Sequence, residues 1–260
     1  MEKNNKKRDF ESIERAPEQA HVGTHDAVIE ILKNLGPGEL LDIGAGTGYF
    51  ASRVAKLWQK TVNVTEIKKE CVKEPGLIVS EVNCDSDKLP YPDSSFDYVT
   101  FVEIIEHLKN PWFAVSEIQR VLKPNGVLVF TTPNISNFRS KLLFLLKNKF
   151  PQFENEEHFS PLEHLHPFAM GELKLILSEN NFNIEKINYG EGYRTRRTWL
   201  YYKKFRAGRP FLRNFFGYCI QNILYIYSRI VSFLLYGSFS TRNRTYGVTI
   251  MLTARKKNGK

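Results

Sequence analysis

The sequence predicts an α/β fold in which a mostly parallel sheet carries helices on both faces. Short apolar runs alternate with helix-period segments from about residue 20 to residue 190, and the links between them are short. A glycine-rich turn over 44–48 joins the first apolar run to a helix. Two acidic residues, Glu66 and Asp85, end later apolar runs, at the edge where open sheets of this kind bind ligands.

Each element follows from a local pattern. An entry helix over 20–35 ends at Gly36-Pro37-Gly38, a helix stop followed by a turn. Apolar runs predict strands at 40–43, 61–67, 77–85, 182–189 and 245–253, and periodic segments predict helices at 111–122 and 169–180. We expect the helix over 111–122 to bury an inward stripe made of Trp112, Val115, Ile118, Val121 and Leu122.

Length and composition fit one sizeable core with an additional segment. The chain has 260 residues, of which 42% are hydrophobic, and a net charge of +9. Its three cysteines, Cys71, Cys84 and Cys219, have neither metal-site nor disulfide spacing, which suits a reducing cytosol. Residues 1–19 are interpreted as a basic flexible tail and lead-in without an apolar signal, so we expect a cytoplasmic protein with one domain over 20–260.

The spacing of the glycines separates two kinds of cofactor. A dinucleotide fingerprint needs G-x-G-x-x-G, and Tyr49 stands where its last glycine would be. The observed form, Gly44-Ala45-Gly46-Thr47-Gly48 preceded by Asp42, resembles motif I of the class I S-adenosylmethionine (SAM) dependent methyltransferases. The alternative is a turn that only lets a helix pack close to the sheet, with Glu66 and Asp85 as solvated strand ends.

Further segments resemble the same family, over roughly residues 20 to 190 and the last strand. Residues 95–108 match its fourth strand and acceptor-side loop, and residues 121–134 match its helix end, turn and fifth strand. The resemblance implies a Rossmann-like, seven-stranded sheet with an antiparallel last strand, and SAM as the cofactor. It implies that Glu66 accepts the ribose hydroxyls and Asp85 the adenine amino group. The implied cofactor-binding residues are Asp42, Gly44, Ala45, Gly46, Gly48, Glu66, Cys84, Asp85 and Val102.

Histidines supply the candidate bases. His107 lies in Glu103-x-x-Glu106-His107, which resembles a segment of ubiquinone-pathway O-methyltransferases near the acceptor, where such a cluster could hold a divalent cation. We expect no metal here, and interpret Glu106 and His107 as groups that hydrogen-bond the loop and cap the next helix.

A second cluster of histidines contains His158, His164 and His166 and precedes the helix over 169–180. Similar methyltransferases pack an H-x-H-x-F segment beside the acceptor pocket. Because the pKa of histidine lies near neutrality, any of these side chains could take a hydroxyl proton. The predicted catalytic residues are His107, His164 and His166.

An insert over 191–244 interrupts the fold between the sixth and seventh strands. Between 191 and 214 it has eight basic residues and one acidic residue, interleaved with aromatic residues, and a long apolar stretch follows over 211–236. Polar residues near the middle of that stretch disfavour a transmembrane helix, and nucleic-acid binding leaves the apolar run unexplained. We expect residues 193–236 to meet an anionic membrane surface, with a lid or dimer face as the alternative.

The predicted function is therefore SAM-dependent methylation, with a hydroxyl of a lipid-linked or amphipathic small molecule as the acceptor and a cytoplasmic location that includes the inner face of the membrane. Two acceptors fit: a sugar hydroxyl on a polysaccharide or glycolipid precursor, and a polyprenylated aromatic ring. N-methylation, a noncatalytic scaffold and a nucleic-acid methyltransferase stay open as alternatives. The last is disfavoured because Glu103 to Glu106 stands where amino-directed enzymes tend to carry an N/D-P-P-Y-like tetrapeptide. The sequence leaves the oligomeric state open.

Overall fold

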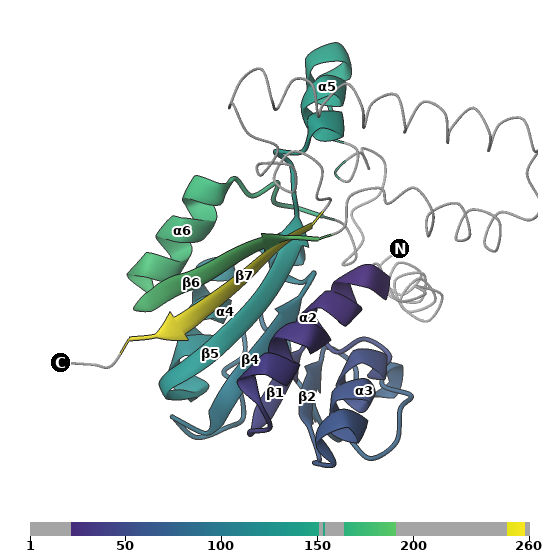
Figure 1. Ribbon diagram of the computed structural model, residues 1–260, viewed down its shortest axis with the longest axis vertical. Coiled ribbons are helices and arrows are strands. Elements are labelled where there is room, and N and C mark those ends of the chain that lie inside the picture. The colour runs from purple at the N-terminus through teal and green to yellow at the C-terminus, as the bar shows by residue number, and fades with distance from the viewer. Residues whose placement is uncertain (1–21, 151–152, 154–163, 191–248, 258–260) are drawn as a thin grey trace, which may run out of the picture.

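A computed structural model describes residues 22–150, 153, 164–190 and 249–257. Its seven-stranded sheet has the order β3-β2-β1-β4-β5-β7-β6 (Figure 1). The strands are β1 (Leu40–Ile43), β2 (Asn63–Glu66), β3 (Ile78–Glu81), β4 (Phe96–Val102), β5 (Leu122–Pro133), β6 (Phe182–Tyr189) and β7 (Thr249–Lys256). The helices are α2 (Val22–Leu35), α3 (Tyr49–Trp58), α4 (Pro111–Val121), α5 (Phe138–Lys147) and α6 (Met170–Glu179), with short 3-10 turns η1 (Lys69–Cys71) and η2 (Ile105–His107).

The pairing of the strands confirms the predicted fold class. Strands β1 to β5 pair in parallel, whereas β7 runs antiparallel to both of its neighbours, β5 and β6. Helix α3 connects β1 to β2 and α4 connects β4 to β5, and helices lie on both faces of the sheet (Figure 1). The parallel strands therefore end at one common edge, here called the carboxyl edge.

The core divides into two layers because successive residues of a strand point to opposite faces. On one face, α2 and α3 pack on the sheet through side chains such as Leu32 and Val54. On the other face, α4 and α6 pack on it through side chains such as Ile118 and Leu173. Both faces of the central strands are thus apolar, which explains why these strands are continuous hydrophobic runs.

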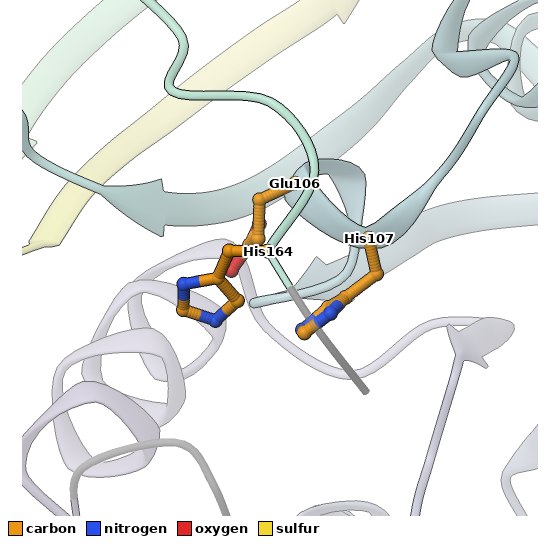
Figure 2. Close-up of side chains that lie close together, drawn as sticks. All are labelled: Glu106, His107 and His164. Atoms are coloured by element: carbon orange, nitrogen blue, oxygen red, sulfur yellow. The ribbon is translucent and has the colours of Figure 1, made fainter. Parts of the chain in front are cut away.

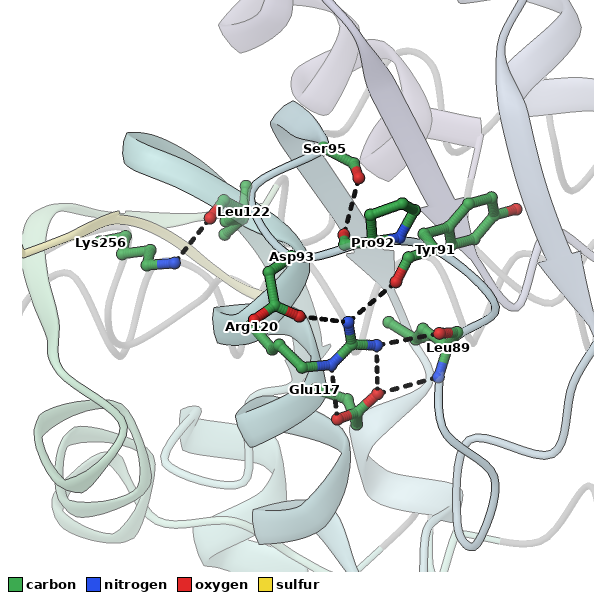
Figure 3. A network of polar contacts seen from close by, with 9 residues as sticks. All are labelled: Leu89, Tyr91, Pro92, Asp93, Ser95, Glu117, Arg120, Leu122 and Lys256. Atoms are coloured by element: carbon green, nitrogen blue, oxygen red, sulfur yellow. Dashed lines mark hydrogen bonds and ion pairs between the residues drawn. The ribbon is translucent and has the colours of Figure 1, made fainter.

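A network centred on Arg120 of α4 fixes the connection between β3 and β4 (Figure 3). The guanidinium donates hydrogen bonds to the carboxylates of Glu117 and Asp93 and to the carbonyls of Leu89 and Tyr91. The Glu117 carboxylate also accepts from the Leu89 N–H at 2.9 Å. Arg120 and Glu117 thereby tie the backbone of this loop to α4.

Several predicted boundaries and one predicted core residue were wrong. Strand β3 ends at Glu81, so Asp85 lies in the following turn, and β7 extends to Lys256. Trp112 is 38% exposed, because its indole N–H donates to Glu179 on α6 at 2.9 Å and keeps the ring at the helix boundary. Helix α5 was not predicted; Asn137 caps it by accepting from the Ser140 N–H.

The sixth and seventh strands place both ends of the intervening chain at the carboxyl edge. The start of β7 pairs with the end of β5, Thr249 opposite Pro133. The Gly190 N–H donates to the Thr249 carbonyl at 2.7 Å, so the chain leaves β6 and returns to β7 at one point. The predicted tail over 1–19 and the insert over 191–244 lie outside the described residues. Within the described parts of the chain, every helix is too short or too polar to cross a membrane.

Candidate active site

The glycine-rich turn has the backbone conformation that its glycines predicted. Gly44, Gly46 and Gly48 have φ values of 70°, 56° and 83°, in the left-handed region that L-residues with a Cβ rarely adopt. A Cβ on Gly44 would collide with the Ile104 side chain, whereas the position of one on Gly46 is open. Gly44 therefore allows close packing, and Gly46 leaves room for a ligand beside the exposed part of the turn.

Strand β2 holds this turn in place through backbone and side-chain acceptors. The N–H groups of Gly44 and Ala45 both donate to the Thr65 carbonyl, at 2.9 and 3.0 Å. The Glu66 carboxylate accepts from the Gly46 N–H at 2.7 Å and from the Ile67 N–H at 2.8 Å. Each carboxylate oxygen keeps a further acceptor position, so Glu66 can bind a ligand hydroxyl while it orders the loop.

Asp42 lies beneath the glycine-rich turn and not on its surface. Its side chain is buried, and Oδ1 accepts a hydrogen bond from the Thr100 hydroxyl at 2.7 Å. Burial raises the pKa of Asp42 to about 7, the Thr100 hydrogen bond opposes this rise, and the charge of Glu66 adds to it. Asp42 therefore joins β1 to β4 through Thr100. Its predicted contact with the cofactor stays a prediction.

The predicted adenine side of the site lies in the turn after β3. The Asp85 carboxylate accepts from the backbone N–H of Asn110, the N-cap residue of α4, at 2.9 Å. Burial raises the pKa of the neighbouring Cys84 thiol to about 12, with the charge of Asp85 as a smaller cause, so the thiol stays neutral. Val102 is the half-buried last residue of β4. The predicted cofactor residues thus lie at the carboxyl ends of four neighbouring strands.

Two glutamates follow β4 and are held by consecutive threonines of β5. Thr131 donates through Oγ1 to the Glu103 carboxylate at 2.7 Å, and Thr132 donates to Glu106 Oε2 at 2.9 Å. Glu103 has a φ of 54°, and its N–H donates to Thr131 Oγ1 at 3.0 Å, which stabilises this uncommon conformation. Burial raises the pKa of both carboxyls, and the charge of Glu103 adds to the rise at Glu106.

Glu106, His107 and His164 form a cluster at the carboxyl edge (Figure 2). Their ligand atoms all lie within 4.8 Å of one another, and the two imidazole rings meet edge to face at 4.7 Å between centroids. The Glu106 carbonyl accepts from the N–H groups of Leu165 and His166, at 2.7 and 3.1 Å. These two bonds hold the segment before α6 against η2 and bring His164 to His107.

Of the other candidate histidines, His166 is described and is not in this cluster. His166 packs its ring on Phe168, 5.5 Å between centroids. His158 lies outside the described residues. The predicted role of Glu106 and His107 as a helix cap was wrong, because the Asn110 side chain caps α4 by accepting from the Phe113 N–H.

The donor set of the cluster is compatible with a divalent cation. It combines one carboxylate with two imidazoles, and among the described residues Glu106 Oε1 is buried without a hydrogen-bond partner. The same arrangement suits proton transfer, because a buried carboxyl beside two imidazoles can orient one of them.

Sequence reasoning did not find the roles of Thr131, Thr132 and Asn110. Asn110 contacts the predicted site residue Asp85. Thr131 and Thr132 contact Glu103 and Glu106, which were not predicted as site residues. All three contacts join different elements, so they depend on strand register and loop packing. The available signal was the pair of threonines at the end of an otherwise apolar strand.

Comparison with known proteins gives the family. A family model described as a methyltransferase domain matches residues 16–187, which is more than half of the chain. The chain belongs to this methyltransferase family. Among solved structures, the methyltransferase resembles the [4+2]-cyclase SpnF (TM-score 0.56, 23% identity, covering 95% of this chain and 85% of that one). It also resembles a SAM-dependent methyltransferase from Archaeoglobus fulgidus (TM-score 0.55, 19% identity, covering 90% and 95%). At these identities the likeness shows the fold alone.

Curated relatives match the methyltransferase over a shorter stretch. The ubiquinone/menaquinone biosynthesis C-methyltransferase UbiE of Paraburkholderia xenovorans strain LB400 is 32% identical over 106 residues, which are 37% of this chain and 44% of that protein. UbiE of Burkholderia mallei strain SAVP1 is 32% identical over 98 residues, 34% and 40% of the two chains. The match therefore spans about two-fifths of the length of these relatives.

The residues of the methyltransferase fit SAM as the cofactor. The open position at Gly46 lies beside the carboxylate of Glu66, and Asp85 follows the neighbouring strand β3. SAM supplies a methyl group that its sulfonium charge has already activated. Glu66 and Asp85 would hold its polar groups, and the chain's task is then to position an acceptor and to move a proton.

Proposed function

We propose that the enzyme methylates a hydroxyl oxygen of a lipid-linked or amphipathic acceptor, with the Glu106, His107 and His164 cluster beside the reacting oxygen. The observation that carries this proposal is the pairing of two imidazoles with a buried carboxyl at the carboxyl edge, next to the cofactor turn. Methyl transfer to a neutral hydroxyl needs a group that removes its proton. Among the predicted site residues, the imidazoles of this cluster are suited to do so near neutral pH.

Methyl transfer to a hydroxyl oxygen requires that one proton be removed from the acceptor. A bond forms between the acceptor oxygen and the methyl carbon, the bond between that carbon and the cofactor sulfur breaks, and S-adenosylhomocysteine leaves. The hydroxyl proton passes to the His107 or His164 imidazole and from there to solvent. Glu106, whose Oε2 is held by Thr132, can accept from the ring that receives this proton through Oε1, because a carboxylate oxygen of Glu106 lies within 4.8 Å of a nitrogen of each imidazole. No metal is needed for this sequence of bonds.

The lipid-linked class of acceptor is supported by the composition of residues 193–236. Basic and aromatic residues are followed there by a long apolar stretch. The described residues that flank this part of the chain, Gly190 and Thr249, lie at the carboxyl edge. A segment of that composition favours an anionic membrane surface, where amphipathic acceptors reside. Cytoplasmic location at the inner face of the membrane and a single domain over 20–260 belong to the same proposal. Nucleic acid is not the proposed partner, because its binding would leave the apolar stretch unused.

The experiment is methyl transfer from SAM labelled with ¹³C in the methyl group to two probes, an alkyl glycoside and a polyprenyl hydroquinone. The carbon resonance of an O-methyl group lies far from that of a ring C-methyl group, so NMR identifies the atom that is methylated. Ether products support the proposal. If neither probe is methylated by protein that binds S-adenosylhomocysteine, the proposed acceptor class is wrong.

A second candidate is C-methylation of a polyprenylated quinol ring, favoured by the names of the matching relatives. The same base would serve, because removal of a phenolic proton also raises the electron density of the ring carbons. A ring C-methyl resonance in the hydroquinone product would select this candidate. A noncatalytic scaffold would give neither product and would tolerate the loss of Asp85.

A further inference from the structure

Helix α5 presents an unusual apolar surface. Phe144, Leu145 and Leu146 are consecutive, and their exposed fractions are 46%, 81% and 69%. Elsewhere in the described chain, large apolar side chains with comparable exposure stand singly, as Leu57 on α3 and Leu175 on α6 do. Scattered exposed apolar residues are ordinary. Three in succession expose apolar side chains around more than half of the helix circumference, because successive residues point about 100° apart, and such an end marks a surface that meets something apolar. We call Phe144, Leu145 and Leu146 the α5 tip.

The base of α5 is anchored, so this exposure is not that of a frayed end. Asn137 and Ser140 are buried, and the Asn137 side chain accepts from the Ser140 N–H at 2.9 Å. At the other end Asn148 takes the left-handed conformation and its N–H donates to the Phe144 carbonyl at 2.8 Å. The helix lies beyond the end of β5, apart from α2, α3, α4 and α6 (Figure 1). It therefore presents its tip at a capped, defined position.

The stretch of chain that contains the tip has charged side chains of one sign. From Asn134 to Phe153 the sequence has four basic residues and no acidic residue. Three of the four, Lys141, Lys147 and Lys149, are exposed. Apolar side chains bordered by lysines complement a surface that offers hydrocarbon below a layer of negative charge. The surface of an anionic lipid bilayer has this chemistry.

A series of aromatic rings connects the tip to the candidate active site. Phe144 stacks on Phe150 with 4.7 Å between centroids and 15° between planes. Phe150 meets Phe153 at 6.4 Å, and Phe153 lies 5.2 Å from the ring of His164. These separations are those of interacting aromatic pairs. The series of ring contacts that begins on the exposed helix thus ends at an imidazole of the proposed base.

We propose that the α5 tip inserts into an anionic membrane surface and that the ring series from Phe144 to His164 lies along the path by which an amphipathic acceptor reaches the site. This deepens the proposed function and rests on its choice of a lipid-linked acceptor. It assigns a membrane contact to residues of the folded domain, separate from residues 193–236 of the insert.

The test is co-sedimentation of the full chain with vesicles of phosphatidylcholine alone and of equal parts phosphatidylcholine and phosphatidylglycerol. The variant is the double substitution Leu145→Glu and Leu146→Glu, and the matched control is Leu175→Glu, an exposed helical leucine away from α5. Wild type and control are expected to bind the mixed vesicles alike, and the double variant at least tenfold more weakly. Vesicles of phosphatidylcholine alone should bind less of the wild type, the double variant and the control than the mixed vesicles do.

Three results would overturn this inference. The first is no binding of wild type to the mixed vesicles. The second is unchanged binding by the double variant, which would leave the contact to the insert. The third is a change of oligomeric state in the double variant with vesicle binding intact, which would make the tip an interface between copies. Calorimetry of S-adenosylhomocysteine on each form separates these results from failure of the fold, and the ¹³C transfer assay separates them from failure of the proposed chemistry.

Discussion

The Glu66 carboxylate accepts a hydrogen bond from the backbone N–H of Gly46 at 2.7 Å, which joins the end of β2 to the middle of the glycine-rich turn. The residue expected to bind the ribose therefore also fixes the loop that passes beside the cofactor. Loop order and cofactor affinity are coupled through one side chain, which gives the first prediction.

Replacement Glu66→Ala removes the acceptor for both the loop and the ligand. Losing hydrogen bonds to a charged group costs roughly 3 kcal/mol, so the Kd for S-adenosylhomocysteine should rise about a hundredfold. Calorimetry measures it. Glu70→Ala, an exposed glutamate in the adjacent turn η1, is the control and should bind like wild type. Equal affinity in both variants would remove Glu66 from the cofactor site.

Asp42 should make stability fall with rising pH. Its pKa is raised from 3.8 to about 7 by burial, so the native state binds more protons than the unfolded state between these values. Its contribution to the free energy of unfolding therefore decreases as the pH rises from about 4 to about 7. Asp42→Asn keeps the acceptor for Thr100 and removes the titration.

The measurement is urea unfolding of wild type and Asp42→Asn across this range. The stability of the variant relative to wild type should rise by roughly 2–4 kcal/mol between the two ends of the window. Glu70→Gln controls for the loss of a carboxylate at an exposed position. A difference that does not change with pH would show that Asp42 titrates alike in both states.

The histidines should differ in their effect on turnover. His164→Ala and His107→Ala are each expected to lower kcat by about a hundredfold or more, because general-base catalysis contributes on that scale. His166→Ala should have a smaller effect, since its ring packs on Phe168 outside the cluster. The assay is methyl transfer to whichever probe is accepted, with S-adenosylhomocysteine affinity as the check on folding. A larger loss in His166→Ala would relocate the base.

Chelation tests whether the cluster works as a base or as a cation site. We expect activity to survive dialysis against EDTA and to remain unchanged when Mg²⁺, Mn²⁺ or Zn²⁺ is added back, because the proposed bond changes need no metal. The readout is the rate of methyl transfer together with metal content by mass spectrometry. Activity that is lost on chelation and restored by one ion would assign Glu106, His107 and His164 as its ligands.

Arg120 should be a stability determinant remote from the chemistry. Arg120→Ala removes the guanidinium donor from the carboxylate of Glu117 and from two loop carbonyls, and is expected to cost about 2–3 kcal/mol of unfolding free energy. Chemical denaturation measures this loss. Lys33→Ala, which breaks an exposed pair with Glu30, should leave stability nearly unchanged. Similar effects from the two variants would mean that the Arg120 network contributes little.

Much of the cofactor side could be predicted because it is local in sequence. The spacing of the three glycines predicted their positive φ values, and the position of Glu66 at the end of an apolar run identified it as a candidate ligand. The boundary of β3 was less predictable, since the residues before Asp85 are apolar enough for a strand but turn away after Glu81. The local sequence predicts where a strand begins better than where it ends, because the end depends on where pairing with the neighbouring strand stops.

The acceptor side depends on contacts between distant segments. His107 and His164 become neighbours because the Glu106 carbonyl accepts two backbone hydrogen bonds from the segment before α6. Nothing in either segment alone selects His164 over His166 for this contact. The exposure of Leu145 on α5 is likewise invisible in the sequence, where a leucine-rich helix suggests burial.

Periodicity and glycine spacing were sufficient for the parallel sheet and the glycine-rich turn, because backbone conformation and strand alternation are dictated by residues close together in the chain. The family and the cofactor followed from the resemblance of these segments to known methyltransferases. The selection of His164 over His166 as the neighbour of His107, and the face that α5 exposes, came only from packing. Both depend on the register of β4 against β5 and on how loops close over the carboxyl edge, and those are collective properties of segments that meet only after folding.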